Sequence, residues 1–303
     1  MSEITLSVRG LRKVIGKREI IQDLSFELKR GEVFGFLGPN GAGKTTTIRM
    51  LVGLIRPTAG TIAICGYELH RHFEQAMKHL GCIVENPELY SYMTGWNNLA
   101  YFSRMIEGVD ESRIKEVVEL VGLSARIHDR VKTYSLGMRQ RLGIAQALLG
   151  RPKVLILDEP TNGLDPSGIR EMRQFIRYLA EREVLSVLVS SHLLSEIQLM
   201  CDRVAIMAKG RIIRVDTVDR LLTEQERVSW RVTPLSAGFE LLAKLAGSAE
   251  QHGETIVTPY SEEQVGQWNR ALVEAGVSVH EMKRKLPSLE DLFIELTGGT
   301  GID

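Results

Sequence analysis

Short apolar runs alternate with helical patterns through the first two thirds of the chain. Four of these runs contain few polar residues and lie at 33–37, 154–157, 185–189 and 204–207. Runs of this kind are typical of strands buried on both faces of a parallel sheet. Earlier stretches, at 4–8 and about 20–28, alternate apolar and polar positions on either side of Gly16 and Lys17, which predicts antiparallel strands. The pattern therefore predicts an α/β fold whose N-terminal part is an antiparallel sheet.

Two further regions differ from this pattern. Residues from about 87 to 150 are dominated by helical periodicity, which predicts a helical subdomain. After residue 216, a charged stretch at 217–227 predicts a linker helix, and residues 228–303 again alternate strand and helix patterns. We therefore expect a main domain at 1–216 and a small C-terminal α/β domain at 228–303, whose strands lie near 228–233, 254–259 and 277–284 and whose helices lie near 238–246, 262–275 and 288–297.

A glycine-rich loop joins the apolar run at 33–37 to a helical pattern at 46–52. It reads G-P-N-G-A-G-K-T from Gly38 to Thr45. Glycines let such a loop curl so that its N–H groups point at phosphate oxygens, and the following helix adds its positive N-terminal end. Lys44 is placed to reach the β- and γ-phosphates, and the Thr45 hydroxyl to ligate Mg²⁺. A Gly-rich turn without a ligand is the alternative, but the full match between strand and helix favours nucleoside triphosphate binding.

Composition narrows the class of protein. The chain has 38 Lys and Arg residues and 38 Asp and Glu residues, so its net charge is zero. It therefore lacks the excess of positive charge that is typical of nucleic-acid-binding proteins. Three scattered cysteines favour a reducing compartment. No apolar run approaches the roughly 18–20 residues that span a bilayer, and the N-terminus lacks a signal-peptide pattern. We expect a cytoplasmic protein that reaches the membrane only through a partner.

Two carboxylates end the apolar run at 154–157. A buried strand in this position can direct Asp158 at the shell of Mg²⁺ and Glu159 at an attacking water as general base. The competing interpretation is a strand that ends in a solvated acidic turn. The phosphate loop upstream favours the catalytic interpretation.

The segment before that strand reads Y-S-L-G-M-R-Q-R, from Tyr134 to Arg141. Ser135 can cap the helix that follows, and the simplest interpretation is a capped amphipathic helix. Together with the phosphate loop, the Asp158–Glu159 pair and Ser190-Ser191-His192, however, the segment resembles the signature motif of ATP-binding cassette (ABC) proteins. Tyr134, Leu136 and Met138 depart from the usual L-S-G-G-Q form, whereas Ser135 and Gly137 match it. The resemblance covers residues 1 to about 220.

This resemblance implies a P-loop NTPase (RecA-like) parallel sheet core with an N-terminal antiparallel β subdomain, a helical signature subdomain and a small C-terminal α/β appendage. It also implies catalytic roles for Lys44, Glu85, Glu159 and His192, with Thr45, Asp158 and Glu85 around Mg²⁺. The residues expected to bind ATP are Ile15, Gly38, Pro39, Asn40, Gly41, Ala42, Gly43, Lys44, Thr45, Thr46, Ser135, Gly137 and Asp165.

Two departures concern the chemistry directly. Glu85 stands where the family usually has a glutamine at the entry to the helical subdomain, a feature similar to the bacitracin and lantibiotic resistance branch. Ile15 stands where an aromatic ring often stacks on adenine, so we expect loose recognition of the base. Asp165 resembles the D-loop residue that reaches across to a second subunit, and His192 resembles the switch histidine that contacts the γ-phosphate.

The resemblance also implies partners. The chain has one phosphate loop and one signature, and in this family each nucleotide lies between the loop of one subunit and the signature of another. We therefore expect a head-to-tail dimer, as a homodimer unless another cassette takes part, and a membrane permease that docks near residues 86–105, where five aromatic residues cluster. The expected function is that of an exporter ATPase acting on a drug or antimicrobial peptide. The alternative is a soluble ABC ATPase that acts on the ribosome or DNA.

Overall fold

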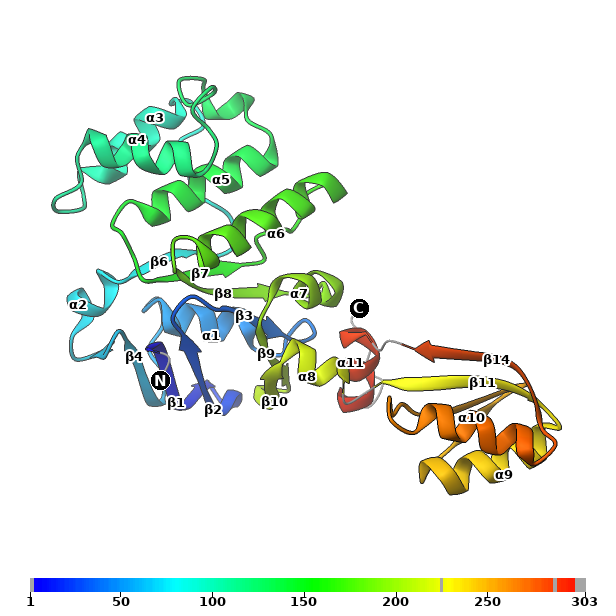
Figure 1. The fold of residues 1–303 in the computed structure, drawn as a ribbon. Helices are drawn as coiled ribbons and strands as arrows, with labels where there is room; N and C mark the ends of the chain where they lie inside the picture. The colour runs from blue at the N-terminus through cyan, green and yellow to red at the C-terminus, as the bar shows by residue number, and fades with distance from the viewer. Residues whose placement is uncertain (1–2, 224–225, 286–287, 298–303) are drawn as a thin grey trace. The chain divides into compact units, whose positions relative to one another are not determined.

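The computed structural model describes residues 3–223, 226–285 and 288–297, which form two compact units. The first unit extends to Thr217 and the second begins at Val218 (Figure 1). Residues 224–225 of the expected linker helix and residues 298–303 of the expected C-terminal domain lie outside the described part.

A six-stranded sheet forms the centre of the first unit. Its order is β10-β9-β3-β8-β7-β6, with bounds Arg211–Thr217, Arg203–Ala208, Val33–Leu37, Ser186–Ser191, Val154–Asp158 and Leu80–Ile83. The five strands from β9 to β6 are parallel, whereas β10 pairs antiparallel with β9. The predicted parallel core is therefore confirmed, and the sheet gains an antiparallel edge strand that the sequence pattern did not reveal.

Alternation along β3 shows how the sheet is covered on both faces. Phe34 and Phe36 pack in one core with Ile48 and Met50 of helix α1 (Lys44–Leu51). Gly35 lies on the other face, where an added Cβ would come within 2.9 Å of Ile197 in helix α7 (Leu194–Met200). In Figure 1, α1 lies between the two sheets of this unit, while α7 and α6 (Pro166–Glu181) lie on the opposite face of the central sheet.

The predicted N-terminal antiparallel strands are present. They belong to a four-stranded sheet of order β2-β1-β4-β5, with bounds Arg18–Lys29, Ile4–Ile15, Ala59–Ile64 and Tyr67–Glu68. Apolar side chains of this sheet, including Leu6, Leu24 and Ile62, are fully buried against α1 in the shared core.

The segment between β6 and β7 is helical, as its periodicity predicts. It contains α3, α4, the short 3₁₀ helix η1 and α5, with bounds Gly95–Ser103, Glu111–Leu120, Val131–Thr133 and Leu136–Leu148. A short helix, α2 (Phe73–Met77), precedes β6. Among the helices of the described residues, none has both the length and the apolar character needed to cross a bilayer.

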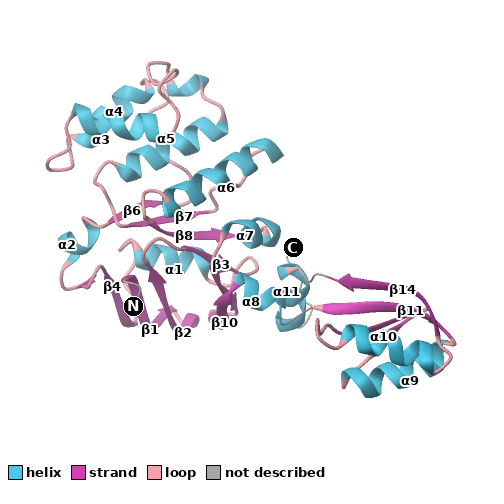
Figure 2. Cartoon of the chain, in the orientation of Figure 1, coloured by secondary structure: helices cyan, strands magenta, loops and turns pink. Residues whose placement is uncertain are grey.

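The second unit is an antiparallel sheet with two helices on one face (Figure 2). The sheet order is β12-β13-β11-β14, and the elements are α8 (Val218–Thr223), β11 (Arg227–Thr233), α9 (Leu235–Ala246), β12 (Glu250–His252), β13 (Thr255–Pro259), α10 (Val265–Glu274), β14 (Ser278–Lys285) and α11 (Leu289–Thr297). From β11 to β14 this is the split β-α-β arrangement of ferredoxin-like folds. The sequence pattern missed β12, because its three residues are all exposed and polar.

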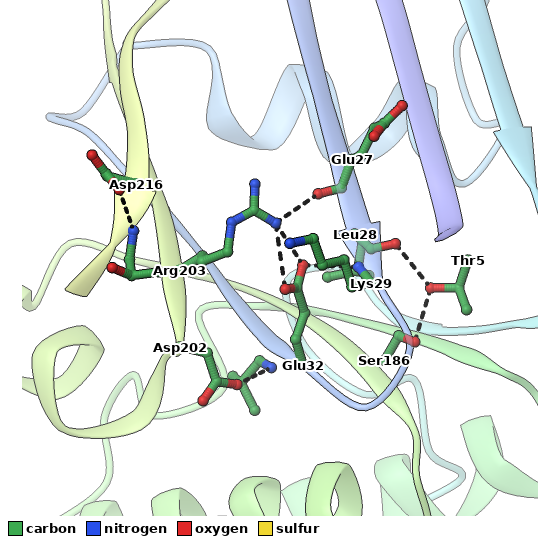
Figure 3. Close-up of polar contacts among 11 residues, drawn as sticks. Thr5, Glu27, Leu28, Lys29, Glu32, Ser186, Asp202, Arg203 and Asp216 are labelled. Atoms are coloured by element: carbon green, nitrogen blue, oxygen red, sulfur yellow. Dashed lines mark hydrogen bonds and ion pairs between the residues drawn. The ribbon is translucent and has the colours of Figure 1, made fainter. Parts of the chain in front are cut away.

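A polar network holds the edge of the central sheet that lies opposite the phosphate loop (Figure 3). Arg203 Nη1 donates to Glu32 Oε1 at 3.0 Å, and the Lys29 N–H donates to the same oxygen at 2.8 Å. Asp202 accepts a hydrogen bond from the Val33 N–H at 2.8 Å. Side chains therefore fix the starts of β3 and β9. Because β3 leads into the phosphate loop, these contacts also help to position that loop.

Candidate active site

Parallel pairing brings three chain segments to one edge of the sheet. The phosphate loop follows β3, Glu159 follows β7 and His192 follows β8, and β8 pairs with both other strands. A cavity of about 550 Å³ opens there, lined by Ile20, Pro39, Asn40, Gly41, Gly43, Lys44, Thr45, Thr46, Glu159, Asn162 and His192. Ligands of open α/β sheets bind at this edge, and the structure brings together there most of the residues expected from the loop.

Two loop glycines are fixed by close contacts. A Cβ on Gly38 would lie 2.7 Å from the Met207 carbonyl oxygen, and a Cβ on Gly43 would lie 2.4 Å from Ile21 Cδ1. Gly43 also has φ of 104°, a conformation that favours glycine. Side chains at these two positions would clash with β9 and β2, so only glycine lets the loop lie this close to those strands.

Lys44 is the buried cation of the loop. Its ammonium donates to the Gly38 carbonyl oxygen at 2.6 Å, and its residue is 7% exposed. Burial lowers the pKa of Lys44, while the charges of Glu159 and Asp158 oppose this shift. A positive group held beside two carboxylates, in a glycine-rich cradle, matches the electrostatics of a phosphate site.

Asp158 and Glu159 are both tied to Ser190 on β8. The Ser190 hydroxyl donates to Asp158 Oδ1 at 2.5 Å and accepts from the Glu159 N–H at 3.0 Å. Burial raises the pKa of Asp158, and the hydrogen bond from Ser190 opposes that rise. Ser190 belongs to the Ser-Ser-His motif, but its contacts with both carboxylate residues depend on the pairing of β7 with β8 and are not visible in the sequence.

Glu159 directly follows β7, and its backbone has a left-handed conformation with φ of 52°. Its Oε2 lies 2.7 Å from His192 Nδ1. Non-glycine residues with such φ values are uncommon and gather at functional sites. The two side chains that border the cavity from different strands therefore fix each other.

Glu85 lies two residues beyond β6 and has φ of 66°. Its carboxylate accepts a hydrogen bond from the Arg49 guanidinium of α1, and it does not line the cavity described above. Its charge nevertheless contributes to the raised pKa of Asp158. The structure thus places the expected metal-binding glutamate beside the site and pairs it with an arginine that the sequence analysis did not identify.

The signature residues line a second cavity, of about 460 Å³. Its lining includes Ser135, Gly137, Leu164, Asp165 and Glu171. The Ser135 hydroxyl caps α5 by accepting from the Met138 N–H at 3.3 Å, and Asp165 caps α6 by accepting from the Gly168 N–H at 2.9 Å. The expected N-cap at Ser135 is confirmed, whereas the cap at Asp165 was not foreseen.

The residue expected at the nucleobase differs from the residue that lines the cavity. Ile15 ends β1 and is 54% exposed, and the cavity is lined instead by Ile20 of β2. Ala42 and Gly38 are also absent from the lining; Ala42 is buried within the loop, and its carbonyl accepts from the Gly210 N–H at 3.1 Å.

Fold and site together define a P-loop nucleoside triphosphatase. The "ABC transporter" family model matches residues 21–162, a range that contains the phosphate loop, the signature and the Asp158–Glu159 pair. The chain belongs to the ABC transporter ATP-binding family, as the resemblance implied. It is an ATP-binding subunit and an ATPase.

Two of the relatives named here match over nearly the whole chain, and a third matches over about two thirds of it. An uncharacterized ABC transporter ATP-binding protein, YhcH of Bacillus subtilis (strain 168), is 51% identical over 97% of this chain and 96% of the relative. The bacitracin transport ATP-binding protein BcrA of Bacillus licheniformis is 40% identical over 97% of each chain. The lantibiotic transport ATP-binding protein SrtF of Streptococcus pyogenes is 41% identical over 69% of this chain and 89% of the relative.

A solved structure described as the ATP-binding subunit of an ABC transporter agrees with the fold. It matches with a TM-score of 0.64 and 30% identity, and the match covers 72% of this chain and 91% of that chain. The transporter names of the full-length relatives support the transport function over the soluble alternative.

Proposed function

We propose that this chain hydrolyses ATP as one half of a head-to-tail homodimer and thereby drives export of an antimicrobial peptide or similar drug through a separate membrane subunit. The observation that carries the proposal is the pair of cavities on one chain. The phosphate-loop cavity and the signature cavity share no lining residue. Each therefore supplies one part of a nucleotide site, and a second subunit supplies the other.

Residues in the two cavities have complementary chemistry. The phosphate loop offers a lysine and backbone N–H groups, and Ser135 offers a hydroxyl at the positive end of α5. A triphosphate between two such surfaces is bound from both sides. Because the same chain carries both surfaces, two copies related head to tail form two sites, which supports the homodimer.

The oxygen donors present fit a magnesium ion. Thr45 lines the cavity and offers a hydroxyl, and the buried Asp158 at the end of β7 offers a carboxylate; such hard oxygen donors would suit Mg²⁺. When bound, this ion neutralises negative charge on the phosphates. Glu159 is placed to accept a proton from the attacking water, His192 orients Glu159, and Lys44 contacts the phosphates.

Exposed aromatic residues support permease docking near residues 86–105. The ring centroids of Tyr90 and Tyr101 are 5.3 Å apart, and those of Tyr90 and Phe102 are 6.1 Å apart. Tyr92 is 65% exposed. Such rings give a partner helix a large and rigid contact area, and docking of this kind would hold the chain at the inner face of the membrane.

The proposed cargo rests on the bacitracin and lantibiotic transport relatives. To test it, the chromosomal gene is replaced with a copy that encodes Glu159→Gln, and growth is measured in bacitracin and in a lantibiotic. We expect at least one of these compounds to inhibit the variant strain at a lower concentration. Unchanged tolerance of both would contradict the proposed cargo, while the ATPase activity of the purified chain, measured separately, would test the enzyme itself.

A further inference from the structure

Arg49 connects the phosphate-loop helix to the start of the helical subdomain. It lies in the last turn of α1, the helix that begins with Lys44. Its guanidinium donates to Glu85 Oε1, and Glu85 lies between β6 and the helices that follow it. One helix therefore carries both the phosphate-binding lysine and the cation that pairs with Glu85.

The charge balance explains why Glu85 needs such a partner. Glu85 and the Asp158–Glu159 pair come at the ends of the neighbouring parallel strands β6 and β7, whose register pairs Ile83 with Leu157. Lys44 lies at the same edge of the sheet, where it lines the cavity together with Glu159. Three carboxylates around one lysine would repel a triphosphate, because like charges at these separations interact unfavourably even in a partly solvated site. The Arg49 charge offsets the charge of Glu85.

Backbone geometry limits where the Glu85 side chain can lie. The residue has a positive φ of 66°. Two residues later, Pro87 packs on α5, since a Cβ added to Gly143 would lie 2.6 Å from Pro87 Cβ. The short segment therefore runs from the end of β6 to the contact of Pro87 with α5, and within it the Glu85 carboxylate pairs with Arg49.

We propose that Arg49 is a positioning residue for the ATP site: it holds the Glu85 carboxylate against α1 and neutralises it, so that a glutamate in this position does not oppose binding of the triphosphate. The inference rests on the proposed site and deepens it. Arg49 and Glu85 are 46% and 58% exposed at their side chains, so the effect is moderate and depends on salt.

The test measures binding without catalysis. Isothermal titration calorimetry measures the affinity for ATP, first in EDTA and then with Mg²⁺. The proteins compared are the wild type, Arg49→Gln, Glu85→Gln and the double variant. Arg49→Gln should weaken binding of ATP in EDTA about three- to fivefold, because it exposes the triphosphate to Glu85. The loss should be smaller with Mg²⁺, which reduces the charge of the ligand, and smaller at high salt. Glu85→Gln should suppress the loss, so the double variant should bind like Glu85→Gln alone.

Controls separate this role from a structural one. Arg151→Gln removes the same charge from another exposed ion pair, with Glu116 in the helical subdomain, and should leave ATP binding unchanged. Unchanged binding by Arg49→Gln, or an equal loss with and without Glu85, would overturn the proposal. Lys44→Ala tests the site itself: normal ATP binding by that variant would contradict the proposed function, whatever Arg49 does.

Discussion

His192 Nδ1 lies 2.7 Å from Glu159 Oε2, although the two residues are 33 positions apart in the sequence. The contact exists because β7 and β8 are parallel neighbours that end at the same edge of the sheet. Ser190 adds a second connection, by accepting from the Glu159 N–H. Glu159 is thus held at its backbone by β8 and at its carboxylate by the residue that follows β8, an arrangement that would suit the proposed general base.

Glu159→Gln should keep ATP binding and slow hydrolysis at least about 100-fold, because general-base assistance contributes roughly 10²–10⁴ in rate. The glutamine conserves the size of the side chain and can still contact His192. The purified variant should also accumulate as an ATP-bound dimer, visible by size-exclusion chromatography with light scattering. Near-normal turnover would remove Glu159 from the role of base.

Ser135→Arg should abolish turnover and leave ATP binding by the monomer nearly unchanged. Ser135 lines the signature cavity and not the phosphate-loop cavity, so a large side chain there obstructs the dimer and not the loop. Binding is measured by calorimetry at low protein concentration, with Lys44→Ala as the control. A binding loss as severe as that of the control would show that both cavities serve one nucleotide within one chain.

Ile15→Trp should lower the KM for ATP about two- to tenfold, because an aromatic contact adds roughly 0.5–1.5 kcal/mol. Ile15 is exposed and does not line the phosphate-loop cavity, whose apolar lining includes Ile20; a ring at position 15 therefore tests whether the bound base extends beyond that cavity. Among the described residues, no Phe, Tyr or Trp lines that cavity, so the wild type should also hydrolyse GTP at a rate similar to ATP. A strong preference of the wild type for ATP would contradict this interpretation.

Sequence patterns predicted the parts of the fold that are buried on both sides. The uniform apolar runs at β3 and β7 are typical of strands covered on both faces, and the loops that follow them carry local motifs. By contrast, β10 and β12 are edge strands with mixed or polar residues, so their formation depends on pairing with β9 and β13. Edge strands lack the burial pattern that makes a strand visible in the sequence.

The same distinction applies to the site. The residues of the phosphate loop follow one another in the sequence, and so do Asp158 and Glu159. Each motif is therefore visible without a structure. The contact of Arg49 with Glu85 joins residues 36 positions apart, and that of Ser190 with Asp158 joins residues 32 apart. Such contacts depend on the order of the strands in the sheet and on the path of the loops that follow them. Neither property can be read from a short stretch of sequence.

Glu32 should make stability depend on pH. Burial is the largest cause of its raised pKa and outweighs the opposing effect of Arg203. A raised pKa means that the contribution of this group to stability is fully present below the ordinary value of 4.5 and is lost as pH rises through the folded-state value. Relative to Glu32→Gln, the wild type should therefore gain stability between about pH 7 and pH 4. Urea unfolding of both proteins across this range measures the difference; a constant difference would contradict the assignment.

Arg203→Met should destabilise the first unit by about 1.5–3 kcal/mol, since it removes the charged donor that contacts both oxygens of Glu32. The two distances are 3.0 and 3.3 Å, and the Glu32 side chain is only 10% exposed, so the remaining carboxylate is left without its cation. Methionine retains much of the apolar stem of the arginine but removes the guanidinium carbon that lies 5.4 Å from the Phe34 ring centroid. The double variant Glu32→Gln with Arg203→Met should lose less stability than the sum of the two single variants, because it leaves no unpaired charge. Calorimetric unfolding of the four proteins gives the coupling energy, and strictly additive losses would mean that the pair does not act as a unit.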